Sequence, residues 1–284
     1  MDVPEQRKIC FITGATSGIG KAASLEIARR GMQVVIAGRD RGKCEKTVAH
    51  IREQTGQPVD YLLADLSSME QVRRMARQYR ENYGRIDVLV NNAGAFFIRR
   101  QESVDGIEMT FAVNHLSYFL LTLLMLDMLK AVPAGRVVNV ASDSHRGQKL
   151  DFADLQLKKH YNGYRAYGYS KLANVLFTYE LARRLEGSRV TANALHPGFV
   201  DTGIWGESLT WARILVRPIV RRIALTPEEG AQTVVYLATA EEVEGITGKY
   251  FTKKKPVRSD PASYDEETAR RLWDLSLELV GPID

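Results

Sequence analysis

Residues 9–20, ICFITGATSGIG, decide the fold of this 284-residue chain. The first five are apolar or β-branched, as in a short buried strand, and from Ile19 to Arg30 apolar residues recur at helical spacing. Between these segments, three glycines occur where the chain has to turn tightly from strand to helix. A strand, a glycine-rich turn and a helix predict the first βα unit of a parallel sheet.

Strands and helices alternate along the rest of the chain. Strands are predicted at residues 9–13, 34–37, 59–64, 88–90, 136–140, 190–195 and 249–251. Helices are predicted at 19–30, 41–54, 67–83 (with Ser67 as its cap), 111–129, 167–184 and 266–279, and another is opened by a capping box from Thr226 to Glu229. Short apolar strands separated by helices indicate right-handed βαβ units. We therefore predict an α/β fold, a single doubly wound Rossmann-type domain over residues 1–284 with a parallel sheet of about seven strands.

Within that domain we expect a cofactor half at about 8–140 and a catalytic and substrate part at about 141–284, with a lid at about 201–225. The lid segment carries apolar residues, among them Trp205 and Trp211, and arginines spaced four apart at positions 213, 217 and 221. Three interpretations stay open. The segment is an apolar cover over the substrate, an amphipathic helix packed on the core, or a surface whose arginines rest on anionic lipid.

Composition excludes several classes of protein. With 45% hydrophobic and 26% charged residues, the chain is an ordinary globular sequence. The net charge of +5 is modest and the basic residues are spread along the chain, so we expect no nucleic-acid partner. Cys10 and Cys44 are interpreted as reduced thiols, which favours a cytoplasmic location. The five histidines show no metal-ligand spacing, so no metal is expected.

Two segments are relevant to a membrane. Residues 1–8 are polar and lead directly into a strand, so no signal peptide or anchor is expected. The most apolar stretch, residues 111–129, carries Asn114, His115 and other polar residues, which favours a buried helix over a membrane span. That helix is apolar almost all round, and either a homodimer contact or neighbouring helices within the domain would account for this.

The glycine turn has the spacing G-x-x-x-G-x-G. Glycines let the backbone approach a ligand closely, and the free N–H groups at the start of the next helix attract a pyrophosphate. A purely structural turn is the alternative, but the strand before it and the helix after it favour a dinucleotide site. The residues expected to contact the dinucleotide here are Gly14, Thr16, Ser17, Gly18, Ile19 and Gly20.

The end of the second strand indicates which dinucleotide binds. Enzymes that use NAD place an acid there for the ribose 2′-hydroxyl, but this chain has Gly38 at that position, followed by Arg39. A guanidinium matches the 2′-phosphate of NADP with two parallel hydrogen bonds. The sequence therefore predicts NADP(H). The alternative is that Arg39 is a solvated loop charge and that Asp40 accepts the hydroxyl.

Two further strand ends are expected to line the cofactor. Asp65 and Leu66 follow the third strand, where the carboxylate can accept a hydrogen bond from the adenine amino group. Asn91, Ala93 and Gly94 follow the fourth strand, where small and amide residues let the backbone pass close to the cofactor.

Tyr167 and Lys171 are the strongest catalytic signal. They are four residues apart on a predicted helix, so their side chains share one face. A nearby ammonium favours the phenolate and is expected to lower the pKa of Tyr167, which suits proton transfer to or from a substrate oxygen. Ser142, at the end of the fifth strand, can donate to the same oxygen. Asn114 interrupts the apolar helix, and a bond to backbone is the alternative to a catalytic role.

These residues resemble the short-chain dehydrogenase/reductase family, and within it the retinol-dehydrogenase-like branch. The resemblance covers nearly the whole chain and is carried by residues 13–20, 91–94, Asn114, Ser142, Tyr167-x-x-x-Lys171, His196-Pro197-Gly198 and 248–251. It implies a catalytic tetrad of Asn114, Ser142, Tyr167 and Lys171, with Asn114 holding a water and Lys171 bonding the nicotinamide ribose. It also implies cofactor contacts from Pro197, Gly198 and Thr202. Several members of that branch carry an N-terminal membrane anchor, and for this chain no such anchor is expected.

The predicted function is that of an oxidoreductase. It would transfer a hydride between NADP(H) and a carbonyl or alcohol, most simply a hydrophobic aldehyde or ketone that is retinal-like, long-chain or steroid-like. The competing interpretation is a non-catalytic dinucleotide sensor or interaction protein on the same fold. A homodimer and peripheral membrane contact through residues 201–223 are further hypotheses.

Overall fold

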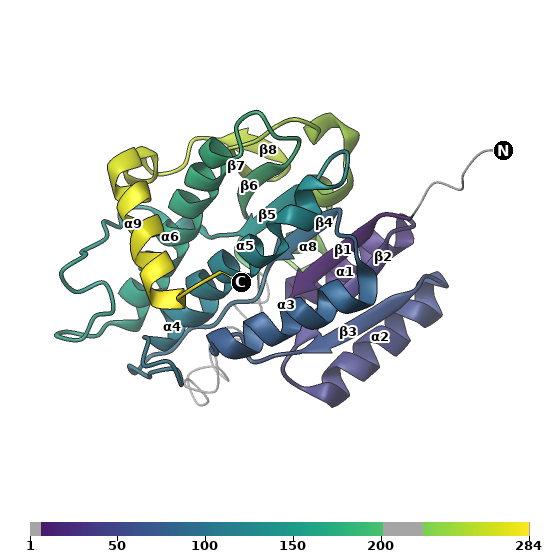
Figure 1. The fold of residues 1–284 in the computed structure, drawn as a ribbon, viewed down its shortest axis with the longest axis horizontal. Helices are drawn as coiled ribbons and strands as arrows, with labels where there is room; N and C mark the ends of the chain where they lie inside the picture. The colour runs from purple at the N-terminus through teal and green to yellow at the C-terminus, as the bar shows by residue number, and fades with distance from the viewer. Residues whose placement is uncertain (1–6, 201–223, 284) are drawn as a thin grey trace.

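The computed structural model describes residues 7–200 and 224–283 (Figure 1). In these residues one sheet has the strand order β3-β2-β1-β4-β5-β6-β7-β8. The strands are β1 Ile9–Thr13, β2 Gln33–Gly38, β3 Val59–Leu63, β4 Val88–Asn91, β5 Arg136–Val140, β6 Thr191–His196, β7 Tyr250–Thr252 and β8 Lys255–Val257. β1 to β7 are parallel, and β8 pairs antiparallel with β7. The doubly wound fold with about seven parallel strands is confirmed.

Helices cover both faces of this sheet (Figure 1). The α-helices are α1 Gly18–Arg29, α2 Arg41–Thr55, α3 Met69–Tyr83, α4 Met109–Phe111, α5 Ser117–Lys130, α6 Gly163–Arg184, α8 Pro227–Thr239 and α9 Glu266–Val280. Between α4 and α5 lies one π-helical turn, η1 Ala112–Leu116. Short 3₁₀ turns occur at η2 Asp143–His145, η5 Glu241–Val243 and η6 Pro261–Tyr264.

Successive strand residues face two separate cores. Phe11 and Val35 point into a core shared with α3, α5, α6 and α9, whereas Ile12 and Ile36 point into a core shared with α1, α2 and α8. Burial of both faces explains why these strands are continuous apolar runs rather than alternating patterns.

The strand order reverses between β1 and β4, which are neighbours although β2 and β3 separate them in the sequence. In a doubly wound sheet, the ligand site lies beyond the carboxyl ends of the strands at this reversal. Thr13 ends β1, Asn91 ends β4 and Val140 ends β5. The residues that follow these three strands therefore converge on one edge of the sheet.

Residues 109–130 form, among the described residues, one helix long and apolar enough to cross a membrane by length and composition. Its most apolar window is 78% buried inside the protein, as expected for a core helix. Phe119 packs against Phe177 of α6 and Trp273 of α9, with ring centroids 5.4 and 5.0 Å apart. Neighbouring helices of the same chain therefore account for most of the apolar surface of this helix.

The helix ends follow the sequence signals with one correction. The capping box from Thr226 to Glu229 at the start of α8 is confirmed. Ser67 does not cap α3, because its hydroxyl donates to Asp65 at 2.8 Å. The cap is Ser68, whose hydroxyl accepts a bond from the backbone of the first turn.

Three elements differ from the sequence prediction. The helix expected at 111–129 is interrupted by the π-turn η1. Helix α6 begins at Gly163 rather than near Tyr167, because the side chain of Asn162 caps its first turn. Strand β8 was not expected at all.

Candidate active site

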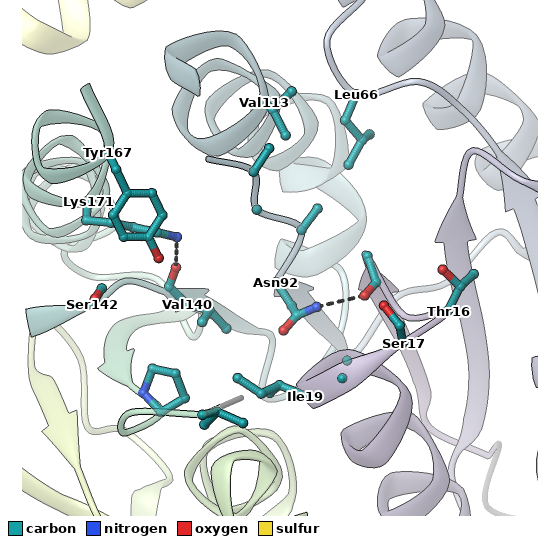
Figure 2. Close-up of a pocket in the computed structure, with 18 of the residues that line it drawn as sticks. Thr16, Ser17, Ile19, Leu66, Asn92, Val113, Val140, Ser142, Tyr167 and Lys171 are labelled. Carbon is teal, nitrogen blue, oxygen red and sulfur yellow. Dashed lines mark hydrogen bonds between the residues drawn. The ribbon is translucent and has the colours of Figure 1, made fainter. Parts of the chain in front are cut away.

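A cleft of about 860 Å³ opens beyond the carboxyl ends of the strands. The predicted site residues that line it are Gly14, Thr16, Ser17, Gly18, Ile19, Gly20, Arg39, Asp65, Leu66, Ala93, Gly94, Ser142, Tyr167, Lys171, Pro197 and Gly198. Asn91 and Asn114 do not line it, and Thr202 lies outside the described residues. Figure 2 shows the glycine turn at one end of the cleft and Tyr167 with Lys171 at the other.

The glycine end of the cleft is built to bring backbone close to a ligand. Gly14 has a φ of +65°, and a Cβ atom on it would lie 2.6 Å from the Cα atom of Ala93. Ser17 precedes α1 without capping it through its side chain, and this described first turn carries no acidic residue. The first N–H groups of α1 and the positive end of its dipole are therefore available to an anion.

The turn is fixed to the neighbouring strand by Thr13 and Asn92. The hydroxyl of Thr13 accepts bonds from the backbone N–H groups of Asn92 and Ala93 at 3.0 and 3.1 Å. The amide of Asn92 donates to the carbonyl oxygens of Thr13 and Gly14 at 2.9 and 3.1 Å (Figure 2). Sequence reasoning assigned no role to Asn92, although its place within residues 91–94 was an available signal.

The end of β2 carries two positive charges. A Cβ atom on Gly38 would lie 2.7 Å from the sulfur of Cys44, so the position that would hold an acid has no room for a side chain. Asp40 caps α2 by accepting a bond from the backbone N–H of Lys43 at 2.9 Å. Arg39 and Lys43 line the cleft, and neither has an ion-pair partner among the described residues. Lys43 was not singled out from the sequence.

Asp65 and Asn91 already have partners within the protein. One carboxylate oxygen of Asp65 accepts bonds from the backbone and the hydroxyl of Ser67 at 2.9 and 2.8 Å. The side chain of Asn91 points into the core, where its amide donates to Thr122 and Asn139, both at 2.9 Å. Because side chains alternate along a strand, it is Asn92, one residue later, that reaches the cleft.

The catalytic end brings together three of the four predicted residues. The ammonium of Lys171 donates to the carbonyl oxygen of Val140 at 2.9 Å, and its nitrogen lies 5.5 Å from the centre of the Tyr167 ring (Figure 2). The hydroxyl of Ser142 lies close enough to the phenol of Tyr167 to lower its pKa. Helix α6 and the end of β5 thus hold a phenol, a hydroxyl and an amine around one space.

Burial dominates the electrostatics of this end. Desolvation raises the pKa of Tyr167 to about 12, although the hydrogen bond with Ser142 lowers it. Desolvation also lowers the pKa of Lys171 to about 7. The expectation that Lys171 lowers the pKa of Tyr167 is therefore wrong for the protein on its own. Burial disfavours the phenolate and, equally, the ammonium that would have stabilised it.

Asn114 lies in the π-turn behind the cleft, and its side chain is fully used. Its amide oxygen accepts from the N–H of Ala95 at 2.7 Å, and its nitrogen donates to the carbonyl oxygen of Ala95 and the hydroxyl of Ser170, both at 3.0 Å. Ser170 in turn donates to the carbonyl oxygen of Tyr167 at 2.7 Å. In this structure the side chain of Asn114 connects the loop after β4 to the helix that carries Tyr167.

The remaining wall of the cleft follows β6. Pro197, Gly198, Phe199 and Val200 line it. A parallel bridge joins Val200 to Leu225, and the N–H of Leu225 donates to the carbonyl oxygen of Phe199 at 2.8 Å. Residues 201–223, which include Thr202 and most of the expected lid, lie outside the described residues. Apolar side chains elsewhere on the wall are those of Phe97, Met109 and Val113.

A glycine turn before an uncapped helix, and a buried tyrosine and lysine at the ends of one parallel sheet, define an α/β dinucleotide-dependent class of protein. Comparison with known sequences gives the family. A model described as "short chain dehydrogenase" matches residues 8–213. The chain belongs to this family, and within it to the retinol-dehydrogenase-like branch.

Its relatives match almost the whole chain. It is 45% identical to retinol dehydrogenase 13 of Homo sapiens, over 96% of this chain and 85% of that protein. It is 38% identical to polyprenol dehydrogenase of Homo sapiens, over 99% of this chain and 87% of that protein. A crystal structure of an uncharacterized protein from Mycobacterium paratuberculosis superposes with a TM-score of 0.79 at 32% identity, covering 98% of this chain and 96% of that one.

Proposed function

We propose that this chain is an NADP(H)-dependent oxidoreductase that transfers a hydride between the nicotinamide and a hydrophobic aldehyde or ketone, or the matching alcohol. One observation carries the proposal: Ser142, Tyr167 and Lys171 meet at the end of β5, in the same cleft as the uncapped start of α1. The membership of the short chain dehydrogenase family supports an oxidoreductase.

The residues present fit a dinucleotide. The close approach of Gly14 to Ala93 leaves a surface of backbone rather than side chains, and the free N–H groups of α1 suit a pyrophosphate. NADP(H) is favoured because Arg39 and Lys43 stand beside the cleft with their charges unpaired among the described residues. The alternative role for Asp40, that of an acceptor for the ribose hydroxyl, is disfavoured because its carboxylate caps α2.

The chain's own residues would transfer the proton to or from the substrate oxygen. The bound cofactor supplies or accepts the hydride. Ser142 donates a hydrogen bond to the substrate oxygen, which polarises the carbonyl and orients it. Tyr167 gives its phenolic proton to that oxygen in reduction, and takes one back in oxidation. With a pKa raised to about 12, the phenol is protonated at neutral pH and is ready to act as the acid.

Lys171 has two proposed roles at this site. Its bond to Val140 fixes its amine at the end of β5, from where it can also hold the nicotinamide ribose. A charged Lys171 favours the phenolate of Tyr167 whenever the ligand stabilises the ammonium. Asn114 is proposed to complete the tetrad by fastening α6 to the loop after β4, through Ser170 and Ala95.

The substrate is proposed to be hydrophobic. Phe97, Met109, Val113 and Phe199 give the cleft its apolar wall. Related proteins bear the names retinol dehydrogenase 13 and polyprenol dehydrogenase, which refer to long apolar alcohols. We further propose a cytoplasmic enzyme, because Cys10 and Cys44 are buried free thiols.

Steady-state kinetics with a series of hydrophobic aldehydes test the proposal. We expect NADPH to be oxidised with a kcat/KM at least tenfold above that for NADH. Equal or better turnover with NADH would contradict the choice of cofactor. Tight NADPH binding without turnover of any aldehyde, or of any alcohol with NADP⁺, would favour the dinucleotide sensor instead.

A further inference from the structure

Ser142 lies two residues beyond Val140, the last residue of β5, where the backbone is no longer paired in the sheet. The last sheet-like bond on this side runs from the N–H of Ala141 to the carbonyl oxygen of Leu195, at 2.8 Å. The carbonyl oxygen of Val140 is already taken by Lys171. The position of the Ser142 hydroxyl therefore depends on contacts other than the strand ladder.

The hydroxyl itself accepts a bond from the N–H of Ser144 and donates to the hydroxyl of Ser144, both at 3.2 Å. The carbonyl oxygen of Ser142 accepts from the N–H of His145 at 3.1 Å and also contacts the imidazole of His145, which is fully buried. Its Nδ1 lies 2.6 Å from the carbonyl oxygen of Ser142, and its Nε2 lies 3.0 Å from the backbone nitrogen of Asp260. A backbone N–H can only donate, so Nε2 is the acceptor and carries no proton. Nδ1 consequently holds the proton and donates it to Ser142. The surroundings fix a single tautomer of a neutral ring.

The C-terminal segment holds the same loop at two more points. The carboxylate of Asp260 accepts a bond from the N–H of Gly147 at 2.8 Å. The guanidinium of Arg146 donates to the carbonyl oxygen of Arg258 at 3.1 Å. Residues 258–260, more than a hundred positions further along the chain, thus support residues 142–147 from the side away from the cleft.

We propose that His145 is a positioning residue for catalysis: its ring transmits the placement of the C-terminal segment to Ser142, and through Ser142 to the phenol of Tyr167. The inference rests on the proposed function, because it assigns Ser142 a role in turnover. Neither His145 nor Asp260 lines the cleft, so neither touches substrate or cofactor.

The surroundings of His145 suit a neutral ring. Burial lowers its pKa, and the charged groups that face it are Asp143 and Arg146 from its own loop and Asp260 from the C-terminal segment. His196 lies close enough to be coupled electrostatically. The ring of Tyr250 packs on its other side, with centroids 4.9 Å apart. A protonated ring would lose the acceptor that holds the Asp260 N–H.

The His145 ring bridges two segments through its hydrogen bonds to Ser142 and Asp260, and two substitutions separate these bonds. In His145→Asn, the amide NH₂ stands near the position of Nδ1 and can still donate to Ser142. In His145→Gln, the longer amide reaches the position of Nε2 and can accept from Asp260, but the donor to Ser142 is lost. His50→Asn, on α2 and away from the cleft, is the matched control.

The measurement is kcat per NADPH-binding site, with NADPH affinity measured separately by fluorescence titration. We expect His145→Gln to lower kcat about 30-fold and His145→Asn about fivefold, since small misplacement of a reacting group costs up to about 100-fold. NADPH affinity should stay within about twofold of wild type, because neither His145 nor Asp260 lines the cleft and the charged contacts proposed for the cofactor lie at its other end. An unchanged kcat per site, or a Gln variant at least as active as the Asn variant, would overturn the inference.

Hydrogen–deuterium exchange separates failure of the inference from failure of the proposed function. In His145→Gln the peptide spanning residues 141–148 should exchange faster than in wild type. If wild type turns over no aldehyde while this exchange rises, the proposed function fails and the bridge stands. An unchanged exchange rate for residues 141–148 would show that the His145 ring does not hold this loop in place. A further variant serves if neither His145 variant folds. Asp260→Ala breaks the side-chain bonds to Gly147 and Ala262 and should lower kcat about threefold. An unchanged kcat would count against the inference.

Discussion

The two ends of the cleft are built from different parts of the polypeptide. Around Gly14 the chain contributes backbone, with a glycine pressed against Ala93 and a helix start that no side chain caps in the described segment. Around Tyr167 it contributes side chains that other groups hold in place: Lys171 is bonded to Val140, and Ser142 is bonded through its carbonyl oxygen to His145.

This contrast has a physical consequence for substitution. A surface made of backbone is harmed by added atoms, since the ligand or the neighbouring strand has to move to make room. A surface made of buried polar side chains is harmed by removed atoms, because the partners left behind are unsatisfied. The following predictions test that difference, from the largest expected effect to the smallest.

Removing the Tyr167 hydroxyl should have the largest effect. Tyr167→Phe deletes the proposed acid and is expected to lower kcat about 1,000-fold, within the usual range for general acid catalysis. NADPH affinity should hardly change. Tyr169→Phe is the control, because this hydroxyl lies on the same helix and, within residues 7–200 and 224–283, accepts hydrogen bonds from Arg165 alone. Turnover that survives in Tyr167→Phe would refute the proton-transfer role.

Removing the Lys171 amine should reveal a stability cost that depends on pH. Its pKa of about 7 in the folded protein lies below the ordinary lysine pKa of 10.5, so between these values the unfolded chain binds the extra proton and stability rises with pH. Lys171→Met removes this dependence. The stability of the variant relative to wild type should therefore be greater at pH 6 than at pH 9.5, by about 3 kcal/mol.

Urea unfolding of the cofactor-free proteins at the two pH values measures this difference. Lys46→Met, on an exposed part of α2, gives the baseline for losing a lysine. No difference would show that Lys171 is as easily protonated in the folded protein as in the unfolded chain, and a difference of the opposite sign would show that it is protonated more easily there.

Adding one carbon at the backbone end should weaken cofactor binding. In Gly14→Ala the new Cβ meets Ala93 at 2.6 Å with a φ of +65°, and we expect NADPH affinity to fall about 30-fold because the turn has to move away from Ala93 to make room. Gly56→Ala is a close control: its φ is also +65°, but nothing lies within 4 Å of the added atom. Isothermal titration compares the two. Equal losses would attribute the effect to backbone strain alone.

Removing a charge at the end of β2 should have the smallest effect, and on selectivity alone. Arg39→Ala is expected to lower the preference for NADPH over NADH about tenfold, the value of one charge-assisted hydrogen bond. Lys43 would retain part of the preference. Arg41→Ala, which pairs with Glu45 and does not line the cleft, is the control. An unchanged ratio of kcat/KM for NADPH to kcat/KM for NADH would show that Arg39 does not determine which cofactor is preferred.

The backbone end was largely predictable from the sequence. A glycine turn between a buried strand and a helix is a local pattern, and so are Gly38 and Arg39 at the end of β2. The structure adds the reason for Gly38: a side chain there would collide with Cys44 and Thr16. The choice between Asn91 and Asn92 was not predictable, because alternation shows only that the two face opposite ways.

The catalytic end was predictable in its residues but not in their environment. The i, i+4 spacing of Tyr167 and Lys171 is local, whereas their pKa values depend on burial by distant parts of the chain. Asn114, in the π-turn, is bonded to Ala95 and Ser170, which are 19 and 56 positions away. Such partners leave no mark in the periodicity of the helix itself.

The missed strand β8 has a similar cause. Its hairpin turn uses Lys253 and Lys254, both with positive φ, at 50° and 64°. Sequence rules look for glycine, asparagine or aspartate at such positions, because lysine is rarely stable there. Here the pairing of β8 with β7 and a bond from the N–H of Lys254 to Thr233 compensate for the unfavourable conformation.

The bridge between Val200 and Leu225 holds the two ends of the intervening segment side by side. The rest of the fold therefore meets two adjacent attachment points, whatever number of residues joins them. Loop-closure entropy changes slowly with length, at about 0.6 kcal/mol per doubling, so a longer or shorter insert costs the fold little. A transplant of the segment from one relative to another at this junction should therefore leave the proton-transfer groups of α6 where they are.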